Sequence, residues 1–131
     1  DIGMAMEYLT QVMKRRCTTF VLSDFYCRED FQHQAQIANR KHDLVAIQVY
    51  DPLAKRLPDV GLMKIRDAET SHEMVIDTSS KKLRQAHARY WLEREESLNE
   101  LFAKSKIDWI SVATNEDYVR PMMSLFAQRG S

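Results

Sequence analysis

Three short, nearly continuous apolar runs constrain this chain more than any other feature of its sequence. They cover residues 17–22, 44–50 and 107–113. Apolar runs that are rich in β-branched residues are typical of strands buried on both faces, as in parallel sheets. Stretches with apolar residues at helical spacing separate the runs, and right-handed crossovers place such helices on both faces of a sheet. The pattern predicts an α/β fold with a parallel core sheet, of the Rossmann-like three-layer kind.

The remaining elements follow from spacing and from turn residues. Helices are predicted at residues 3–16, where the run Lys14-Arg15-Arg16 forms the last turn, at 29–41, from about 78–80 past Phe102, and at 116–128 with Asn115 as cap. Residues 53–61 are predicted to be a loop, and 62–66 and 73–77 to be a peripheral β-hairpin with one wet face. Three core strands make a small sheet for four helices, which fits an α/β domain whose first half is missing.

Length and charge set the broad class. The 131 residues suffice for one domain, and 19 basic residues balance 19 acidic ones, which gives no sign of a nucleic-acid-binding surface. No apolar run approaches the length of a membrane span, and the first residues lack the features of a signal peptide. A chain that begins at Asp1 is expected to be part of something longer. Cys17 and Cys27 are expected to be free thiols in a reducing compartment, which predicts a cytoplasmic protein.

Polar residues follow each of the three predicted core strands. They are Ser23 and Asp24, Asp51, and the segment 114–117. Ligands of open parallel sheets bind beyond the carboxyl ends of the strands, and oxygen ligands suit Mg²⁺. The alternative is that Asp51 makes an Asp-Pro turn and that residues 114–117 cap the next helix. Both interpretations are open at this point.

Other constellations give little support to catalysis. The four histidines share no metal-ligand spacing, so packing or surface roles are expected for His33, His42, His72 and His87. The Ser-x-x-Lys of residues 79–82 lies at a predicted helix start, where capping is the expected role. Tyr90 and Trp91 are expected in the core or on a partner surface. We therefore expect no enzyme, and a metal-assisted hydrolase that uses the strand-end carboxylates is a minor alternative.

Several segments together resemble one bacterial family. They are RKHDLVAIQVYDP at 40–52, LPDVG at 57–61, RDAET at 66–70, VIDTS at 75–79, AMEYL at 5–9, FVLSDF at 20–25 and EDYVRP at 116–121. This series is similar to bacterial domain-of-unknown-function family number 58, over nearly all of the chain. Members of the family look like von Willebrand factor A-type domains and are commonly encoded beside MoxR-type AAA+ ATPases.

The resemblance implies a divalent-ion site, of which this chain carries only a part. Such domains bind the ion through an Asp-x-Ser-x-Ser segment, a Thr and a later Asp. Ser23-Asp24 matches the last of these, so Asp24 is the implied metal ligand and Ser23 a weaker candidate. No Asp-x-Ser-x-Ser occurs in the chain. Residues 1–131 therefore resemble the carboxyl-terminal part of the domain, with no cofactor of their own, while Mg²⁺ or Mn²⁺ is expected in the full-length protein.

The function implied is an adaptor: a metal-dependent protein-binding module linked to a MoxR-type ATPase system. The alternative is a metal-independent scaffold that packs against a partner through the hairpin and the long helix. In both cases the strand at 17–22 has an open apolar edge, because the strand beside it in a complete sheet is missing. Such edges recruit other chains, so residues 1–131 alone are expected to form a homo-oligomer through that edge or the bared helix faces.

Overall fold

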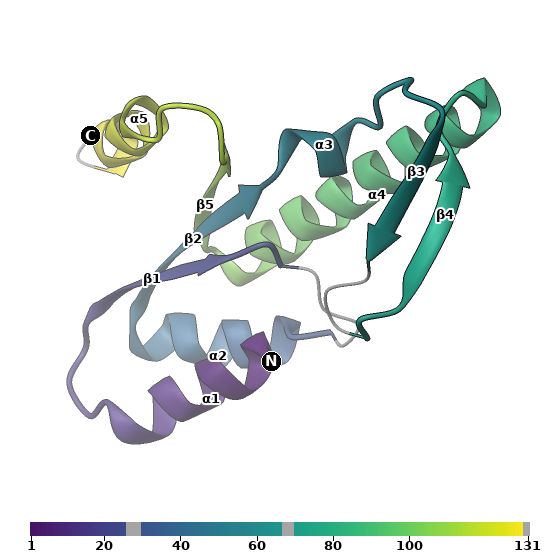
Figure 1. Ribbon diagram of the computed structural model, residues 1–131. Coiled ribbons are helices and arrows are strands. Elements are labelled where there is room, and N and C mark those ends of the chain that lie inside the picture. The colour runs from purple at the N-terminus through teal and green to yellow at the C-terminus, as the bar shows by residue number, and fades with distance from the viewer. Residues whose placement is uncertain (26–29, 67–69, 130–131) are drawn as a thin grey trace.

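A computed structural model of the chain describes residues 1–25, 30–66 and 70–129. The helices are α1 (Ile2–Val12), α2 (Gln32–Lys41), α3 (Pro52–Lys55), α4 (Lys81–Ser105) and α5 (Val119–Arg129). The strands are β1 (Thr18–Ser23), β2 (Asp43–Tyr50), β3 (Leu62–Arg66), β4 (Glu73–Asp77) and β5 (Asp108–Ala113). Figure 1 shows the core sheet between helices and the hairpin β3–β4 standing beside it.

The core sheet has the order β1-β2-β5, and both pairings are parallel. Strand β2 lies in the centre, and its residues Leu44 to Gln48 are all buried. This burial confirms the prediction of a parallel sheet that is covered on both faces. Among the described residues, β1 forms one edge of this sheet and β5 the other.

One face of the sheet is covered by α1, α2 and α4. Their residues form a single apolar cluster with the face of β2 that carries Leu44 and Ala46. The cluster contains Met6, Phe25, Phe31, Ala35, Ala38, Leu44, Ala46, Leu98, Phe102 and Ile107. Phe102 is fully buried and contacts the rings of Phe25, Phe31 and Trp109. Helices α2 and α4 therefore cover this face together.

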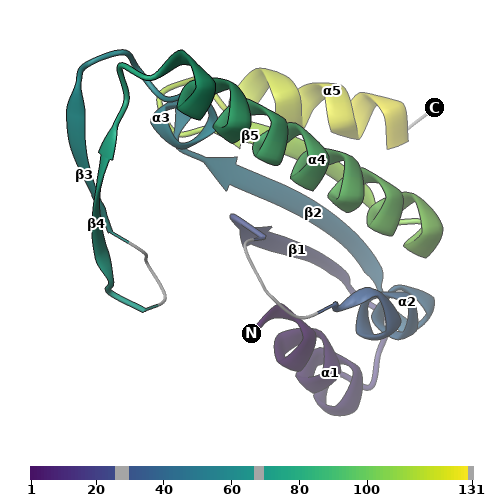
Figure 2. The same cartoon turned by 90° about the vertical axis from the view of Figure 1, so that its right-hand side faces the viewer.

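Helix α5 covers the opposite face, so helices lie on both sides of the sheet. In Figure 1, α5 lies across the core strands from α2 and α4, and in the turned view of Figure 2 it lies behind α4. Phe126 on α5 contacts Phe20 on β1 with 5.9 Å between ring centroids. Near the carboxyl end of α5, the guanidinium of Arg129 bonds to the carboxylates of Asp43 and Asp108. These two aspartates begin β2 and β5, so one cation fastens α5 to both strands.

The hairpin β3–β4 is antiparallel and has the predicted bounds. Its base is closed by Thr78, which is fully buried. The hydroxyl of Thr78 donates to the carbonyl oxygen of Gly61 at 2.6 Å and accepts from the backbone N–H of Val60 at 3.1 Å. Gly61 has a φ of +79°, a value that favours glycine, so this residue turns the chain into β3.

Two predicted helix boundaries are wrong. Helix α1 ends at Val12, and Met13 is already extended, so Lys14-Arg15-Arg16 follow the helix instead of forming its last turn. The last helix begins at Val119 and not at Glu116, and the carboxylate of Asp117, rather than Asn115, accepts the N–H of Val119 at 3.0 Å. Pro121 explains the second error, because proline is tolerated in the first turn but not further along a helix.

Two further corrections concern α2 and α3. Helix α2 begins at Gln32, later than the predicted residue 29, which lies outside the described residues. It ends at Lys41, with His42 as its carboxyl-terminal cap. The predicted loop after β2 begins with the short helix α3. Asp51 caps this helix and Pro52 occupies its first turn, so Asp-Pro here starts a helix instead of excluding one.

Candidate functional site

The carboxyl ends of β1, β2 and β5 meet at one edge of the sheet, as the sequence predicts. In the register, Ser23 lies beside Gln48, and Tyr50 lies beside Ala113. The polar residues after the three strands therefore share this edge. Their side chains have separate roles, however, and most of these roles are local.

Asp51 and Asp117 act as the turn and capping interpretation expects. The Asp51 carboxylate accepts the N–H of Leu53 at 2.9 Å, and Asp117 accepts that of Val119. Both carboxylates are thus engaged at the start of a helix. Within residues 1–25, 30–66 and 70–129, no three His, Cys, Asp or Glu side chains come together in a way that could hold a metal ion.

The segment Ser23-Asp24, which carries the predicted metal ligand, is held by its neighbours. Ser23 Oγ accepts the backbone N–H of Phe25 at 3.0 Å. Phe25 has a φ of 54° and is buried in the core. The backbone carbonyl oxygen of Asp24 accepts a hydrogen bond from the guanidinium of Arg94 at 3.0 Å. Arg94 of α4 therefore holds the main chain of this segment through a contact 70 residues distant in sequence.

A pocket of about 580 Å³ opens beyond the ends of β2 and β5, between α3, α4 and the β5–α5 connection. It is lined by Tyr50, Pro52, Leu53, Lys55, Arg56, Ala88, Trp91, Leu92, Glu95, Ala113, Asn115 and Glu116. Tyr50 and Trp91 form its aromatic part, with ring centroids 6.1 Å apart. Leu53 and Leu92 are exposed at its mouth. The pocket lining therefore combines apolar and aromatic side chains with charged ones.

The charged and aromatic groups of this pocket form one network. Trp91 Nε1 donates to Glu95 Oε1 at 2.9 Å. Lys55 Nζ lies 3.6 Å from the same oxygen and 5.2 Å from the centre of the Tyr50 ring. The guanidinium of Arg94 also lies over the Trp91 ring, 5.5 Å from its centre. Because Arg94 also holds the main chain of Asp24, the network links the pocket to the end of β1.

The sequence indicated some members of this site and missed others. Trp91 was expected in the core or on a partner surface, and it lines the pocket while nine-tenths buried. Its pair with Glu95 has the i, i+4 spacing of helix neighbours and was recognisable in principle. Lys55 and Arg94 were missed, because their partners lie far away along the chain and only the packing of α3 and α4 brings them together.

The histidines and the described cysteine lie apart from the pocket network, with one exception. His87 Nε2 lies 2.5 Å from the carbonyl oxygen of Ala54 near the pocket. His42 is fully buried at the start of β2, and its Nδ1 accepts the backbone N–H of Cys17 at 3.1 Å. Cys17 is a free thiol, while Cys27 lies outside the described residues. These contacts are consistent with packing roles.

Of the two serines before α4, Ser80 has the expected capping role. Ser80 Oγ accepts the N–H of Leu83 at 3.2 Å, and Ser79 bonds to the carboxylate of Asp77 instead of to a lysine. Both bonds order the turn between β4 and α4.

None of the helices in the described part of the chain has the length and apolar character that crossing a membrane requires.

The chain matches a family model described as "Protein of unknown function DUF58" over residues 1–97. "Uncharacterized protein Rv1480" of Mycobacterium tuberculosis (strain ATCC 25618 / H37Rv) is 26% identical over 131 residues, which are 98% of this chain and 40% of that protein. "Uncharacterized protein MAV169" of Mycobacterium avium is 33% identical over 79 residues, 59% of this chain and 47% of that protein. The chain thus spans less than half the length of these curated relatives.

Among solved structures, the crystal structure of the conserved hypothetical protein BatB from Bacteroides thetaiotaomicron aligns with a TM-score of 0.49 and 15% identity. The alignment covers 98% of this chain and 58% of BatB.

Proposed function

This chain belongs to the DUF58 family of proteins of unknown function, and within that family we propose that it serves as a protein-binding module rather than as an enzyme. The observation that carries the proposal is the pocket beyond β2 and β5. Leu92, with 56% of its surface exposed, and Leu53 flank the nearly buried Trp91. Tryptophan, tyrosine and arginine dominate the energetic centres of protein interfaces, and exposed apolar neighbours exclude water around them. Tyr50, Trp91 and Arg56 supply such groups here.

The partner proposed is a MoxR-type AAA+ ATPase, and the binding is proposed to depend on a divalent ion. This part rests on the resemblance to von Willebrand factor A-type domains. Asp24, at the end of β1, would supply one oxygen ligand, with Ser23 beside it. Mg²⁺ needs several ligands, so the others would come from the longer protein outside residues 1–131, and a carboxylate of the partner would complete the site.

The test is a calorimetric titration of the longer protein with a MoxR-type ATPase, the proposed partner, in the presence of Mg²⁺. A Leu92→Glu variant places a charge at the mouth of the pocket and should weaken binding at least tenfold, about 1.4 kcal/mol. Met123→Glu is the matched control, since Met123 is equally apolar and exposed but lies on α5. Equal affinities for Leu92→Glu and wild type would refute the pocket as the binding site.

A second candidate is a metal-independent scaffold, which the hairpin favours. The pairs Met63–Ile76 and Ile65–Met74 place four apolar side chains on one face of this two-stranded sheet. Its other face carries ion pairs of Glu73 with Lys64 and Arg66. Two-stranded sheets are marginal alone, so an apolar face of this kind gains from a partner. Loss of ATPase binding in Met74→Lys, with binding intact in Leu92→Glu, would select the scaffold.

We also propose a cytoplasmic location and self-association of residues 1–131. The free thiol of Cys17 supports a reducing compartment. The open edge of β1 and the exposed face of α1 support self-association. Sedimentation velocity at increasing micromolar concentrations should show a rising average mass. A constant monomer mass over that range would contradict this part of the proposal.

A further inference from the structure

The carboxyl ends of the helices and the amino ends of the core strands lie at one edge of the molecule. In Figure 2, α4 and α5 end on the right-hand side, where β2 begins beside α2. Side chains of α2 bond to its neighbours at this edge. Lys41 Nζ donates to the carbonyl oxygen of Thr10 in α1 at 2.5 Å. Asn39 Nδ2 donates to the carbonyl oxygens of Ser105 and Lys106, each at 3.0 Å, so the ends of α1, α2 and α4 adjoin one another.

Positive charge gathers at this edge, although the chain as a whole has no net charge. Asp43 and Asp108 begin β2 and β5 here, but the guanidinium of Arg129 already pairs with both carboxylates. Glu100 lies more than a helical turn before the end of α4. The other charged side chains, which we call the basic edge, are exposed and come from the α1–β1 connection and the ends of α2 and α4. They are Lys14, Arg15, Arg16, Arg40, Lys104 and Lys106.

The structure does not need these cations to hold the helix ends. Basic side chains near the carboxyl end of a helix often bond to its last carbonyl groups. Here Lys41 and Asn39 already bond to such groups of α1 and α4. In the part of the chain that the structure describes, no side chain of the basic edge forms an ion pair or donates a hydrogen bond. Their charges are therefore available to a partner.

We propose that the basic edge docks onto the anionic headgroups of a phospholipid bilayer. Clusters of lysine and arginine bind such surfaces through the negative potential of the headgroups. Met13 directly precedes Lys14 and is 43% exposed, so an apolar side chain lies beside the cations. Apolar groups next to basic ones enter the boundary between headgroups and acyl chains and strengthen binding at a membrane surface.

The shape of the basic edge favours a bilayer over nucleic acid. Duplex DNA is read by a helix or a strand pair that lies along a groove, whereas α1, α2 and α4 present only their ends here. Single strands are bound on aromatic platforms, and the basic edge contains no aromatic residue. Docking through this edge would also turn the carboxyl ends of the strands, and the pocket beyond β2 and β5, away from the bilayer. This inference does not depend on what that pocket binds.

Co-sedimentation of the longer protein with lipid vesicles tests the proposal. The protein should bind vesicles of mixed phosphatidylglycerol and phosphatidylcholine but not vesicles of phosphatidylcholine alone. Binding should weaken as NaCl is added, because salt screens the headgroup charge. The triple variant Lys14→Gln/Arg15→Gln/Arg16→Gln should bind the mixed vesicles at least about tenfold more weakly, since each cation near an anionic bilayer contributes about fivefold.

A second variant probes the same edge on other elements. Arg40→Gln/Lys104→Gln removes one cation from α2 and one from α4 and should weaken vesicle binding at least about fivefold. The side chains replaced in both variants have no partner in the described part of the chain, so the melting temperature should stay that of the wild type. A loss of binding with an unchanged melting temperature therefore reports on the surface and not on folding.

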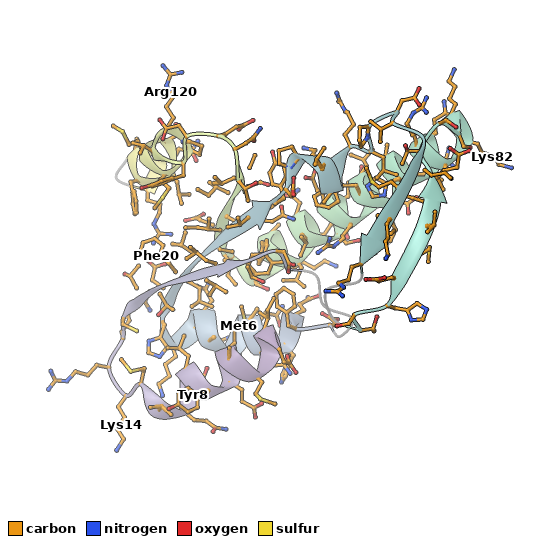
Figure 3. The ribbon with its side chains drawn as sticks, in the orientation of Figure 1. Met6, Tyr8, Lys14, Phe20, Lys82 and Arg120 are labelled. Atoms are coloured by element: carbon orange, nitrogen blue, oxygen red, sulfur yellow. The ribbon has the colours of Figure 1, made fainter. Side chains whose placement is uncertain are left out.

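The matched control removes the same charge from another part of the molecule. Lys81→Gln/Lys82→Gln/Arg89→Gln changes three exposed cations in the first half of α4. Figure 3 shows Lys82 at the opposite end of the molecule from Lys14. This control should keep the vesicle affinity of the wild type.

Four outcomes would overturn the proposal. Absence of binding to the mixed vesicles at low salt would refute it directly. Equal binding to neutral vesicles would show that apolar contact, and not headgroup charge, holds the protein. Equal losses in the control and in the variants of the basic edge would show that net charge alone matters. Tighter binding to a duplex DNA oligonucleotide than to the mixed vesicles, lost in the same variants, would identify nucleic acid as the partner.

Discussion

The indole nitrogen of Trp91 donates a hydrogen bond of 2.9 Å to Oε1 of Glu95, one helical turn further along α4. Lys55 of α3 lies 3.6 Å from the same oxygen. The Glu95 carboxylate therefore accepts the hydrogen bond of the partly buried indole N–H. It also attracts Lys55 and with it the short helix α3, which lines the pocket. The shape of the pocket depends on this carboxylate.

Replacing Glu95 should therefore affect stability and pocket structure together. Glu95→Ala leaves the indole N–H without its acceptor and should lower the free energy of unfolding by about 1 kcal/mol. Glu95→Gln keeps an acceptor and should cost less. The loss of stability in Glu95→Gln against wild type reports on the Lys55 contact, and the difference between the two variants reports on the bond to the indole. Urea denaturation followed by the fluorescence of Trp91, in a Trp109→Phe background, measures both. Equal stability of Glu95→Ala and wild type would contradict the role assigned to this bond.

Arg129 should hold α5 on the sheet. Its guanidinium lies between the carboxylates of Asp43 and Asp108, and its side chain is mostly buried. Arg129→Gln should lower stability by about 1–2 kcal/mol. It should also make α5 cleave faster under limited proteolysis, since fewer contacts then fasten the helix. Asp108→Asn is the graded control. The Asp108 side chain is more exposed than that of Asp43, so Asp108→Asn should lower the free energy of unfolding less than Arg129→Gln does. Unchanged cleavage of α5 in Arg129→Gln would count against this role.

Asp77 gives a prediction about pH. The hydroxyl and the backbone N–H of Ser79 both donate to its carboxylate, at 2.5 and 3.1 Å, and they lower the pKa of Asp77 below its usual 3.8. A lowered folded-state pKa stabilises the protein above the unfolded pKa, and this contribution is lost as the pH falls through the folded value. Ser79→Ala removes the larger of the two bonds, so the pKa of Asp77 should rise toward 3.8.

An NMR titration of the Asp77 carboxyl carbon measures this change. Ser80→Ala is the matched control, because it removes the α4 cap at a cost of about 1 kcal/mol without touching Asp77. A pKa of Asp77 that is equal in Ser79→Ala and wild type would mean that the backbone N–H alone causes the shift.

The fold was largely predictable because its signals are local. The apolar run at β2 and the alternation of Met63, Ile65, Met74 and Ile76 in the hairpin report burial directly. The helix boundaries that were predicted wrongly depend on single residues such as Pro121. The effect of a proline depends on its position within the helix, and that position is not known from the sequence. The pocket was not predictable, because the Lys55–Glu95 contact joins elements 40 residues apart. The metal site predicted at Asp24 stays a prediction.

That site is tested by titrating Mg²⁺ and Mn²⁺ into the longer protein and into residues 1–131. A single carboxylate does not displace enough water from Mg²⁺ to bind it well, so residues 1–131 should show no saturable binding. The longer protein should bind one ion, and Asp24→Ala should abolish this binding. Asp51→Ala is the matched control, since Asp51 follows the neighbouring strand but caps α3. Saturable binding that survives Asp24→Ala but not Asp51→Ala would move the site to the end of β2. Binding by neither protein would leave the metal-independent scaffold as the better account, because the apolar face of the hairpin needs no ion to hold a partner.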